Sequence, residues 1–169
     1  MNKLIIKNLR KILFMTALTA LFLAVSVQFS STALAFNVQP QTVIVEQQNN
    51  TISGEVRGFV FRNGEKIPAV NVVPGEQILW EMTLTNTSAR LVRNISFDGD
   101  IPQGTVYVTN SASGVDFSLD GKAFSRTPMV RDQSGSLTPA PVSAYRAIRF
   151  TVSLNANETK TLTYKTTVK

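Results

Sequence analysis

The sequence predicts an all-β fold: a single antiparallel β-sandwich of seven to nine strands that follows a cleaved signal peptide. Three observations predict it. Apolar and polar residues alternate with a period of two through the mature region. Turn-forming residues interrupt these runs at short intervals. The mature region also lacks the 3.6-residue period of an amphipathic helix. Short strands at this spacing are typical of two packed antiparallel sheets.

The N-terminus has the order of a secretory signal peptide. It opens with four basic residues, Lys3, Lys7, Arg10 and Lys11. Residues 12–29 then run without a charge, and Ala33-Leu34-Ala35 places small residues where a signal peptidase accepts them. We expect residues 1–35 to be the signal peptide, with cleavage after Ala35. The alternative is an uncleaved membrane anchor, because an apolar run of this length nearly spans a bilayer.

Composition limits the chemistry of the mature chain, residues 36–169, which has the size of one domain. Four of the 17 basic residues and none of the 11 acidic ones lie in residues 1–35, so cleavage lowers the net charge from +6 to +2. This balance gives no reason to expect nucleic acid as a partner. The chain has neither cysteine nor histidine, which excludes thiol nucleophiles, Ser-His-Asp sites and the commonest zinc ligands. We expect no enzyme activity and no cofactor.

Residues 36–53 differ from the rest of the mature chain because they are polar and rich in glutamine and asparagine. Within them, Val43 to Val45 are β-branched and predict an edge strand. The remainder of this segment is expected to be an N-terminal arm. The sandwich domain is expected over residues 54–169.

Strands are expected near nine positions: Thr42, Glu55, Lys66, Gln77, Leu91, Thr105, Val115, Arg146 and Lys160. Alternate residues of a strand point to opposite faces, so one set in each run should face a core. These inward residues are Ile78, Trp80, Met82 and Leu84; Ile95 and Phe97; Val115, Phe117 and Leu119; Ile148, Phe150 and Val152; and Leu162, Tyr164 and Val168. The aromatic residues expected to share one core are Trp80, Phe97, Phe117, Phe150 and Tyr164.

Turn signals separate the expected strands. Asn63-Gly64 and Asp120-Gly121 predict two-residue hairpins, because type I′ turns need positive φ at both central positions. Further corners are expected at Pro74-Gly75, at residues 102–104 and at residues 155–158. Arg126 to Pro141 is the least regular segment, and we expect a long loop there with one short strand.

Several motifs follow one another along the mature chain: "VVPGEQILWEMTLTNTS", "DGDIPQGTVYVTNSASG", "DFSLDGKAF", "AYRAIRFTV" and "LNANETKTLTYKTTV". In order and spacing they resemble the DUF11 conserved repeat domain family of bacterial surface and secreted proteins. The resemblance covers about Val43 to Val168. The residues that match the family pattern are Pro74, Gly75, Glu76, Trp80, Thr85, Asn86, Asp100, Ile101, Pro102, Gly104, Thr105, Ser111 to Ser113, Phe117, Asp120, Gly121, Tyr145, Ile148, Phe150, Leu154 and Glu158.

The resemblance implies an immunoglobulin-like β-sandwich, often arranged in tandem on cell surfaces, with no known chemistry. Two features depart from the family. Ser88 stands where the family has glycine after Thr-Asn-Thr, so this turn is expected to differ in type. The domain also stands alone in this sequence, so the role of a spacer within an array does not transfer to it.

Asp98-Gly99-Asp100 supports two interpretations. The first is a scaffold corner before Ile101-Pro102, where aspartate accepts backbone N–H bonds and glycine turns freely. The second is a calcium site at Asp98 and Asp100, because calcium binds carboxylate and carbonyl oxygens. Two carboxylates do not fill six to eight coordination positions, and Asp116 and Asp120 lie a strand or more away. The corner is favoured, and no metal is expected.

The other candidate residues favour structural roles. The acidic residues are scattered rather than paired, as glycoside hydrolysis would require. Trp80 would suit a carbohydrate platform, but its phase with Ile78 places it in the core. Arg146 and Arg149 flank a strand, where a solvated edge is favoured over an anion site. Four residues begin Asn-x-Ser/Thr sequences, which the bacterial resemblance makes incidental: Asn49, Asn86, Asn94 and Asn157.

Two classes of function remain. The first is a non-catalytic exported envelope or surface module that binds a protein or surface polymer through a sheet edge or a loop face. The second is a structural subunit that self-associates through such an edge. A glycan-active hydrolase is a distant alternative. The expected location is the periplasm, the extracellular space or the cell surface, and an uncleaved signal peptide would be the only membrane contact.

Overall fold

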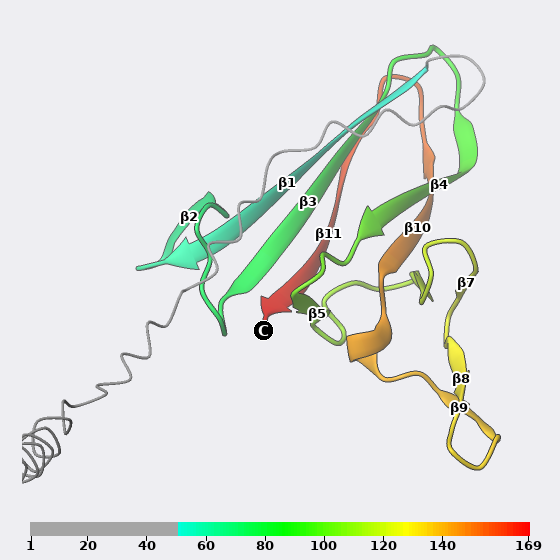
Figure 1. Cartoon of the computed structure of the whole chain (residues 1–169). Coiled ribbons are helices and arrows are strands. Elements are labelled where there is room, and N and C mark those ends of the chain that lie inside the picture. Colours follow the sequence, from blue (N-terminus) through cyan, green and yellow to red (C-terminus); the bar gives the residue numbers. More distant parts are fainter. Residues whose placement is uncertain (1–50) are drawn as a thin grey trace, which may run out of the picture. The chain divides into compact units, whose positions relative to one another are not determined.

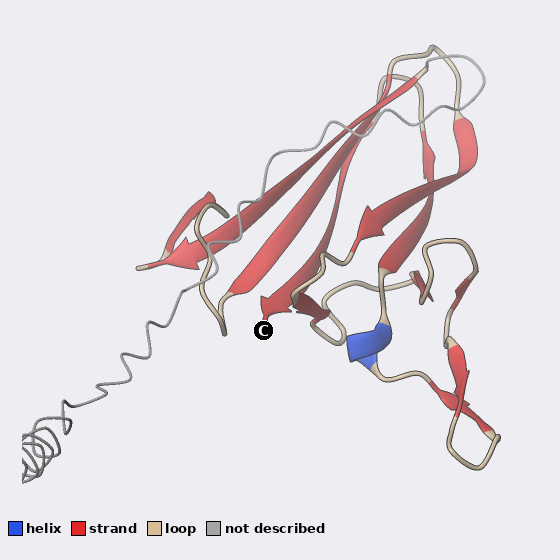
Figure 2. Cartoon of the chain, viewed as in Figure 1, coloured by secondary structure: helices blue, strands red, loops and turns tan. Residues whose placement is uncertain are grey.

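A computed structural model describes residues 51–169 (Figure 1). These residues form eleven β-strands and one short 3-10 turn, η1 (Val142–Ala144) (Figure 2). The strands make two antiparallel sheets and a small hairpin, so the predicted all-β sandwich is confirmed. There are more strands than the seven to nine expected, because five of them are only two or three residues long. The expected signal peptide and the expected strand at Val43 to Val45 lie outside the described residues.

The first sheet has the strand order β2-β1-β3-β11-β5. Its strands are β1 (Ile52–Arg62), β2 (Glu65–Pro68), β3 (Gln77–Asn86), β11 (Thr159–Val168) and β5 (Thr105–Tyr107). β3 lies at the centre, where it pairs with β1 on one side and with β11 on the other. Burial along β3 follows the predicted alternation, since Ile78, Trp80, Met82 and Leu84 are all buried.

The second sheet has the strand order β4-β10-β6-β7. Its strands are β4 (Val92–Asp100), β10 (Ala147–Leu154), β6 (Asp116–Ser118) and β7 (Phe124–Ser125). β10 pairs with β4 along most of its length, and the register shifts once, near the start of β4. There Arg93 and Asn94 lie opposite Ser153, and Asn94 has a φ of 54°. This is a β-bulge, which bends a strand and strengthens its twist.

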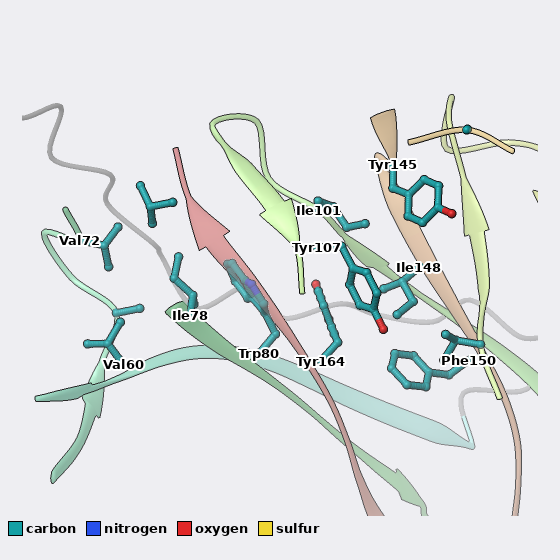
Figure 3. Packing of buried hydrophobic residues seen from close by; sticks show 14 residues of the cluster. Val60, Val72, Ile78, Trp80, Ile101, Tyr107, Tyr145, Ile148, Phe150 and Tyr164 are labelled. Atoms are coloured by element: carbon teal, nitrogen blue, oxygen red, sulfur yellow. The ribbon is translucent and has the colours of Figure 1, made fainter. Parts of the chain in front are cut away.

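Two clusters of buried side chains lie between the sheets. The larger one contains Trp80, Phe150 and Tyr164 (Figure 3). The smaller one consists of Ile52, Met82, Leu84, Ile95, Phe97 and Leu154. The expectation of one shared aromatic core was therefore wrong for Phe97, because its side chain packs on the Met82–Leu84 half of β3 and not on the Trp80 half. Phe117 is only partly buried, against the larger cluster.

The two predicted two-residue hairpins have different outcomes. Asn63-Gly64 forms one, with φ values of 53° and 83° between the paired residues Arg62 and Glu65. Asp120-Gly121 does not, because Ser118 pairs with Phe124 and five residues connect β6 to β7. The buried Ser118 hydroxyl accepts the Asp120 and Gly121 N–H groups, so a side chain holds this turn. Ser118 is therefore buried, whereas the sequence pattern predicted that its neighbours Phe117 and Leu119 face the core.

The segment expected to be a long loop with one strand contains two strands. β8 (Met129–Arg131) and β9 (Leu137–Pro139) pair with each other as a hairpin outside both sheets. The prediction of one strand was wrong because it missed the turn that joins them. The Asp132 carboxylate accepts bonds from the backbone N–H groups of Ser134 and Ser136, at 2.9 and 3.0 Å, and from the Ser134 hydroxyl.

Candidate functional site

Asp98-Gly99-Asp100 is the end of strand β4 and not a corner. All three residues pair with β10, and Gly99 does not have a positive φ. The chain turns only afterwards, where Gly104 has a φ of 86° and the Thr105 N–H donates to the Pro102 carbonyl. The expectation that Gly99 turns freely was therefore wrong in its physical reason. A different constraint requires glycine at this position.

Gly99 lies against the ring of Tyr164 from the opposite sheet. A Cβ atom at position 99 would lie 3.0 Å from both Cε1 and the hydroxyl oxygen of Tyr164, so any larger side chain would displace the ring. The Tyr164 hydroxyl donates to the Asp100 carbonyl oxygen at 2.5 Å. Burial, followed by the nearby Asp100 charge, raises the pKa of Tyr164, so the phenol stays protonated. The middle of the motif is thus a packing contact between sheets.

The Asp98 carboxylate is paired with Arg149. The Nε and Nη2 groups of Arg149 donate to its two oxygens at 2.7 and 2.8 Å, a bidentate arrangement. The Arg149 guanidinium also lies 3.7 Å from the Phe124 ring centroid, a cation–π contact. Arg149 belongs to β10, which has neighbours on both sides, so the edge position expected for it was wrong. These contacts connect three strands of the second sheet.

The acids near this motif are engaged with the protein. Arg126 pairs with Asp116 at 3.0 Å. Asp120 accepts the Lys122 and Ala123 N–H groups at 2.8 and 3.0 Å, and these bonds are the main reason why its pKa is lowered. Across residues 51–169, no group of three or more His, Cys, Asp or Glu side chains could hold a metal ion. The calcium hypothesis for Asp98 and Asp100 gains no further ligand from the described fold.

Trp80 and Asn86 both have structural roles. Trp80 is buried, and its Nε1–H donates to the Thr166 hydroxyl at 3.0 Å, so it offers no carbohydrate platform. Asn86 is fully buried, and its Nδ2 donates to the carbonyls of Arg90, Leu154 and Asn155. This amide therefore joins the β3–β4 connection to the β10–β11 connection. It is not accessible to a glycosylating enzyme in the folded chain.

Ser88 and Arg146 both form local hydrogen bonds. The Ser88 N–H and hydroxyl both donate to the Asn86 Oδ1 atom, at 3.0 and 2.7 Å, so the serine side chain supplies a bond within this turn. Arg146 is exposed just before β10, and its Nη1 donates to the Ser143 and Tyr145 carbonyls at 3.2 Å. Neither arrangement forms an anion site.

Within residues 51–169, the β8–β9 hairpin presents exposed apolar side chains on one of its faces. Met129 lies opposite Pro139 and Arg131 opposite Leu137, so these four side chains share one face. All four are exposed, with Met129 at 45% and Leu137 at 60%. Val130, on the other face, packs against the larger core cluster. We call these four residues the hairpin face. Sequence reasoning missed it, although Ser134-Gly135 between two short β-branched or apolar runs was a turn signal.

A second unpartnered feature is the outer edge of β4. Among the described strands, β4 pairs with β10 alone, so along nine residues one side of its backbone has no strand neighbour. The bulge at Arg93 and Asn94 and the charges of Asp98 and Asp100 lie at the two ends of this edge. Bulges and charges at edges discourage unintended pairing, which leaves Ile95 to Phe97 as the least protected part.

Comparisons with protein-family models, with curated proteins and with solved structures found no match. The resemblance to the DUF11 family therefore stays a prediction from the motifs. No helix among residues 51–169 is long and apolar enough to span a membrane.

Proposed function

We propose that this protein is an exported, non-catalytic envelope or surface module of the DUF11 type, with an immunoglobulin-like sandwich, that binds another protein through the hairpin face. The observation that carries the proposal is the exposure of Met129 and Leu137 on a hairpin with a well-defined conformation. Exposed apolar side chains gathered on one face are typical of protein-binding surfaces. The signal-peptide pattern of residues 1–35 supports export.

The conformation of the hairpin supports this role. The Asp132 carboxylate fixes the turn, and Arg131 Nη1 donates to the Gly135 carbonyl at 2.7 Å across it. A surface held in one conformation loses less conformational entropy on binding. Methionine and arginine are enriched at protein interfaces, and this face has no aromatic ring on which a sugar could stack. These features favour a protein over a surface polymer as the partner.

Site-specific photocrosslinking in the source cells tests the proposal. A photoreactive amino acid replaces Leu137 in one strain and, as the matched control, Thr163 on the exposed face of β11 in another. We expect a discrete crosslinked product from position 137 alone, and its loss in a Met129→Asp background. Equal products from both positions, or none from position 137, would contradict binding through the hairpin face. The intact mass of the exported chain tests cleavage after Ala35 in the same cells.

The second candidate is a structural subunit that self-associates through β4. The observation that favours it is the long unpaired edge of that strand. Two such edges meet in an antiparallel, two-fold arrangement without any further partner. Sedimentation of the purified mature chain separates the two candidates, because a dimer disrupted by Ser96→Pro but not by Met129→Asp would favour self-association.

A further inference from the structure

The backbone ladder of the β8–β9 hairpin leaves outward groups on the residues that form the hairpin face. Two bonds lie at the ends of this ladder, at 2.8 and 2.9 Å: the Ala140 N–H to the Pro128 carbonyl, and the Asp132 N–H to the Ser136 carbonyl. Hydrogen-bonded and non-hydrogen-bonded residue pairs alternate along an antiparallel ladder. The pairs Met129–Pro139 and Arg131–Leu137 are therefore non-hydrogen-bonded, and their N–H and C=O groups point away from the hairpin.

The outer edge of β8 offers more backbone groups than the outer edge of β9. On β8, Met129 and Arg131 each offer an N–H and a C=O group. On β9, Leu137 offers both groups, but Pro139 offers only a carbonyl because proline has no N–H. Among residues 51–169, β8 pairs with β9 alone, and no backbone group bonds to its outward groups. An extended segment of another chain would find both donors and acceptors along β8.

The side chains of the same two residues indicate the chemistry of such a segment. Met129 is apolar and 45% exposed. The Arg131 Nη1 group donates to the Gly135 carbonyl at 2.7 Å, whereas its Nε and Nη2 groups form no ion pair among the described residues. These two groups form the fork that binds a carboxylate in a bidentate arrangement. A carboxylate opposite Arg131 and an apolar side chain opposite Met129 would complement β8.

We propose that the partner of the hairpin face binds as an extended strand that pairs antiparallel with β8. Antiparallel pairing lets one partner residue bond to both backbone groups of Arg131, and a second one to both groups of Met129. These two partner residues lie two apart and share one face. The partner segment therefore reads acidic residue, any residue, apolar residue. This inference rests on the proposed function, to which it adds the conformation and the chemistry of the partner.

Selection from a peptide library tests the chemistry of the partner. Random linear peptides displayed on phage are selected on the full mature chain. We expect the enriched sequences to share an acidic residue two positions before an apolar one. The Arg131→Glu chain should instead enrich a basic residue at the acidic position, because the charge opposite it is reversed. One enriched peptide is then synthesised and used as the probe for affinity measurements.

Proline substitutions separate backbone bonds from side-chain contacts. Met129→Ala and Met129→Pro both remove the side chain, but only Met129→Pro removes the outward N–H, which makes no bond within the hairpin. The peptide should bind about tenfold more weakly to Met129→Pro than to Met129→Ala, because a peptide carbonyl loses its hydrogen bond. Leu137→Ala and Leu137→Pro are the matched controls on β9 and should bind the peptide equally. Protection of the Val130 amide from hydrogen exchange checks that each variant keeps the hairpin.

Three results would overturn the proposal. The first is equal affinity of the peptide for Met129→Ala and Met129→Pro, and the second is a library that yields no acidic consensus. Neither result affects the crosslinking from position 137, so strand addition to β8 and binding through the hairpin face fail separately. The third is a mature chain that sediments as a dimer and that Met129→Pro converts to a monomer, because a second copy would then occupy β8.

Discussion

At the scale of single residues, the contact between Gly99 and Tyr164 explains the central motif better than a turn does. A glycine that lies in regular strand geometry is costly unless something must approach its Cα closely. Here the Tyr164 ring fills the space of a side chain and its hydroxyl binds the backbone of the next residue. The flanking aspartates lie on the exposed side of the strand. The motif therefore combines one packing contact and one ion pair.

Gly99→Ala should destabilise the domain by about 1–3 kcal/mol, because the new methyl group overlaps a fully packed ring. The Tyr164 hydroxyl oxygen is one of the two Tyr164 atoms that would lie 3.0 Å from a Cβ at position 99, and Tyr164→Phe removes it. The double variant should therefore lose less stability than the sum of the losses in the two single variants. Urea unfolding of the four proteins measures this. Ser96→Ala, on the exposed side of the same strand, is the control and should change stability by less than about 0.5 kcal/mol. Additive effects would show that a side chain at position 99 does not overlap the Tyr164 hydroxyl oxygen.

Calcium should leave the melting temperature unchanged. Asp98 is already bound to Arg149, and a metal that bound the folded state would raise the unfolding temperature by mass action. Calorimetry in EDTA and in excess calcium measures this. Asp100→Asn should change stability by less than about 0.5 kcal/mol, since its exposed carboxylate has no role in the ion pair. A large rise in melting temperature with calcium that Asp100→Asn abolishes would instead establish a metal site.

At the scale of elements, hydrogen bonds from side chains determine the conformation of two turns that dipeptide patterns did not predict. Asn63-Gly64 behaves as predicted because both residues accept positive φ and the flanking strands are long enough to fix the register. Asp120-Gly121 fails because Ser118 and Asp120 satisfy the local N–H groups with their own oxygens and stabilise a longer loop. In the β8–β9 turn, the Asp132 carboxylate likewise accepts bonds from backbone N–H groups. Such side-chain bonds to the backbone compete with the regular turn types.

Acid should loosen the β8–β9 turn. The Ser134 hydroxyl bond, aided by the backbone N–H groups of Ser136 and Ser134, lowers the pKa of Asp132 below the value of about 3.9 in an unfolded chain. The charged form therefore stabilises the turn above about pH 4, and this contribution is lost as the pH falls through the folded-state pKa. The protection of the Ser134 and Ser136 amides against hydrogen exchange, relative to the intrinsic rate at each pH, should fall at low pH. Asp132→Asn should remove this dependence, whereas Asp116→Asn should preserve it.

At the scale of the whole molecule, local patterns predicted which residues are buried but not which strands are neighbours. The alternation in residues 77–86 and the phase of Ile95, Phe97, Ile148 and Tyr164 agree with the structure. β3 pairs with β11, although 73 residues separate the end of β3 from the start of β11. No pattern within either segment of the sequence indicates this pairing. The same holds for Asp98 with Arg149 and for Gly99 with Tyr164. These contacts depend on sheet order, which periodicity does not encode.

The two core clusters should unfold as one unit. Val56 and Leu162 pack against both clusters, and β3 contributes Trp80 to one and Met82 to the other, so neither cluster can open without the other. Trp80 is the only tryptophan and its fluorescence reports on the larger cluster, while circular dichroism reports on all strands.

Phe97→Ala, in the smaller cluster, should reduce the free energy of unfolding by about 3–5 kcal/mol. It should shift both transitions to the same lower denaturant concentration, because a two-state domain has one midpoint for every probe. Fluorescence that keeps the wild-type midpoint while circular dichroism moves would show that the clusters are separate folding units. Val56→Ala should then deepen the separation, because it removes a side chain that joins them.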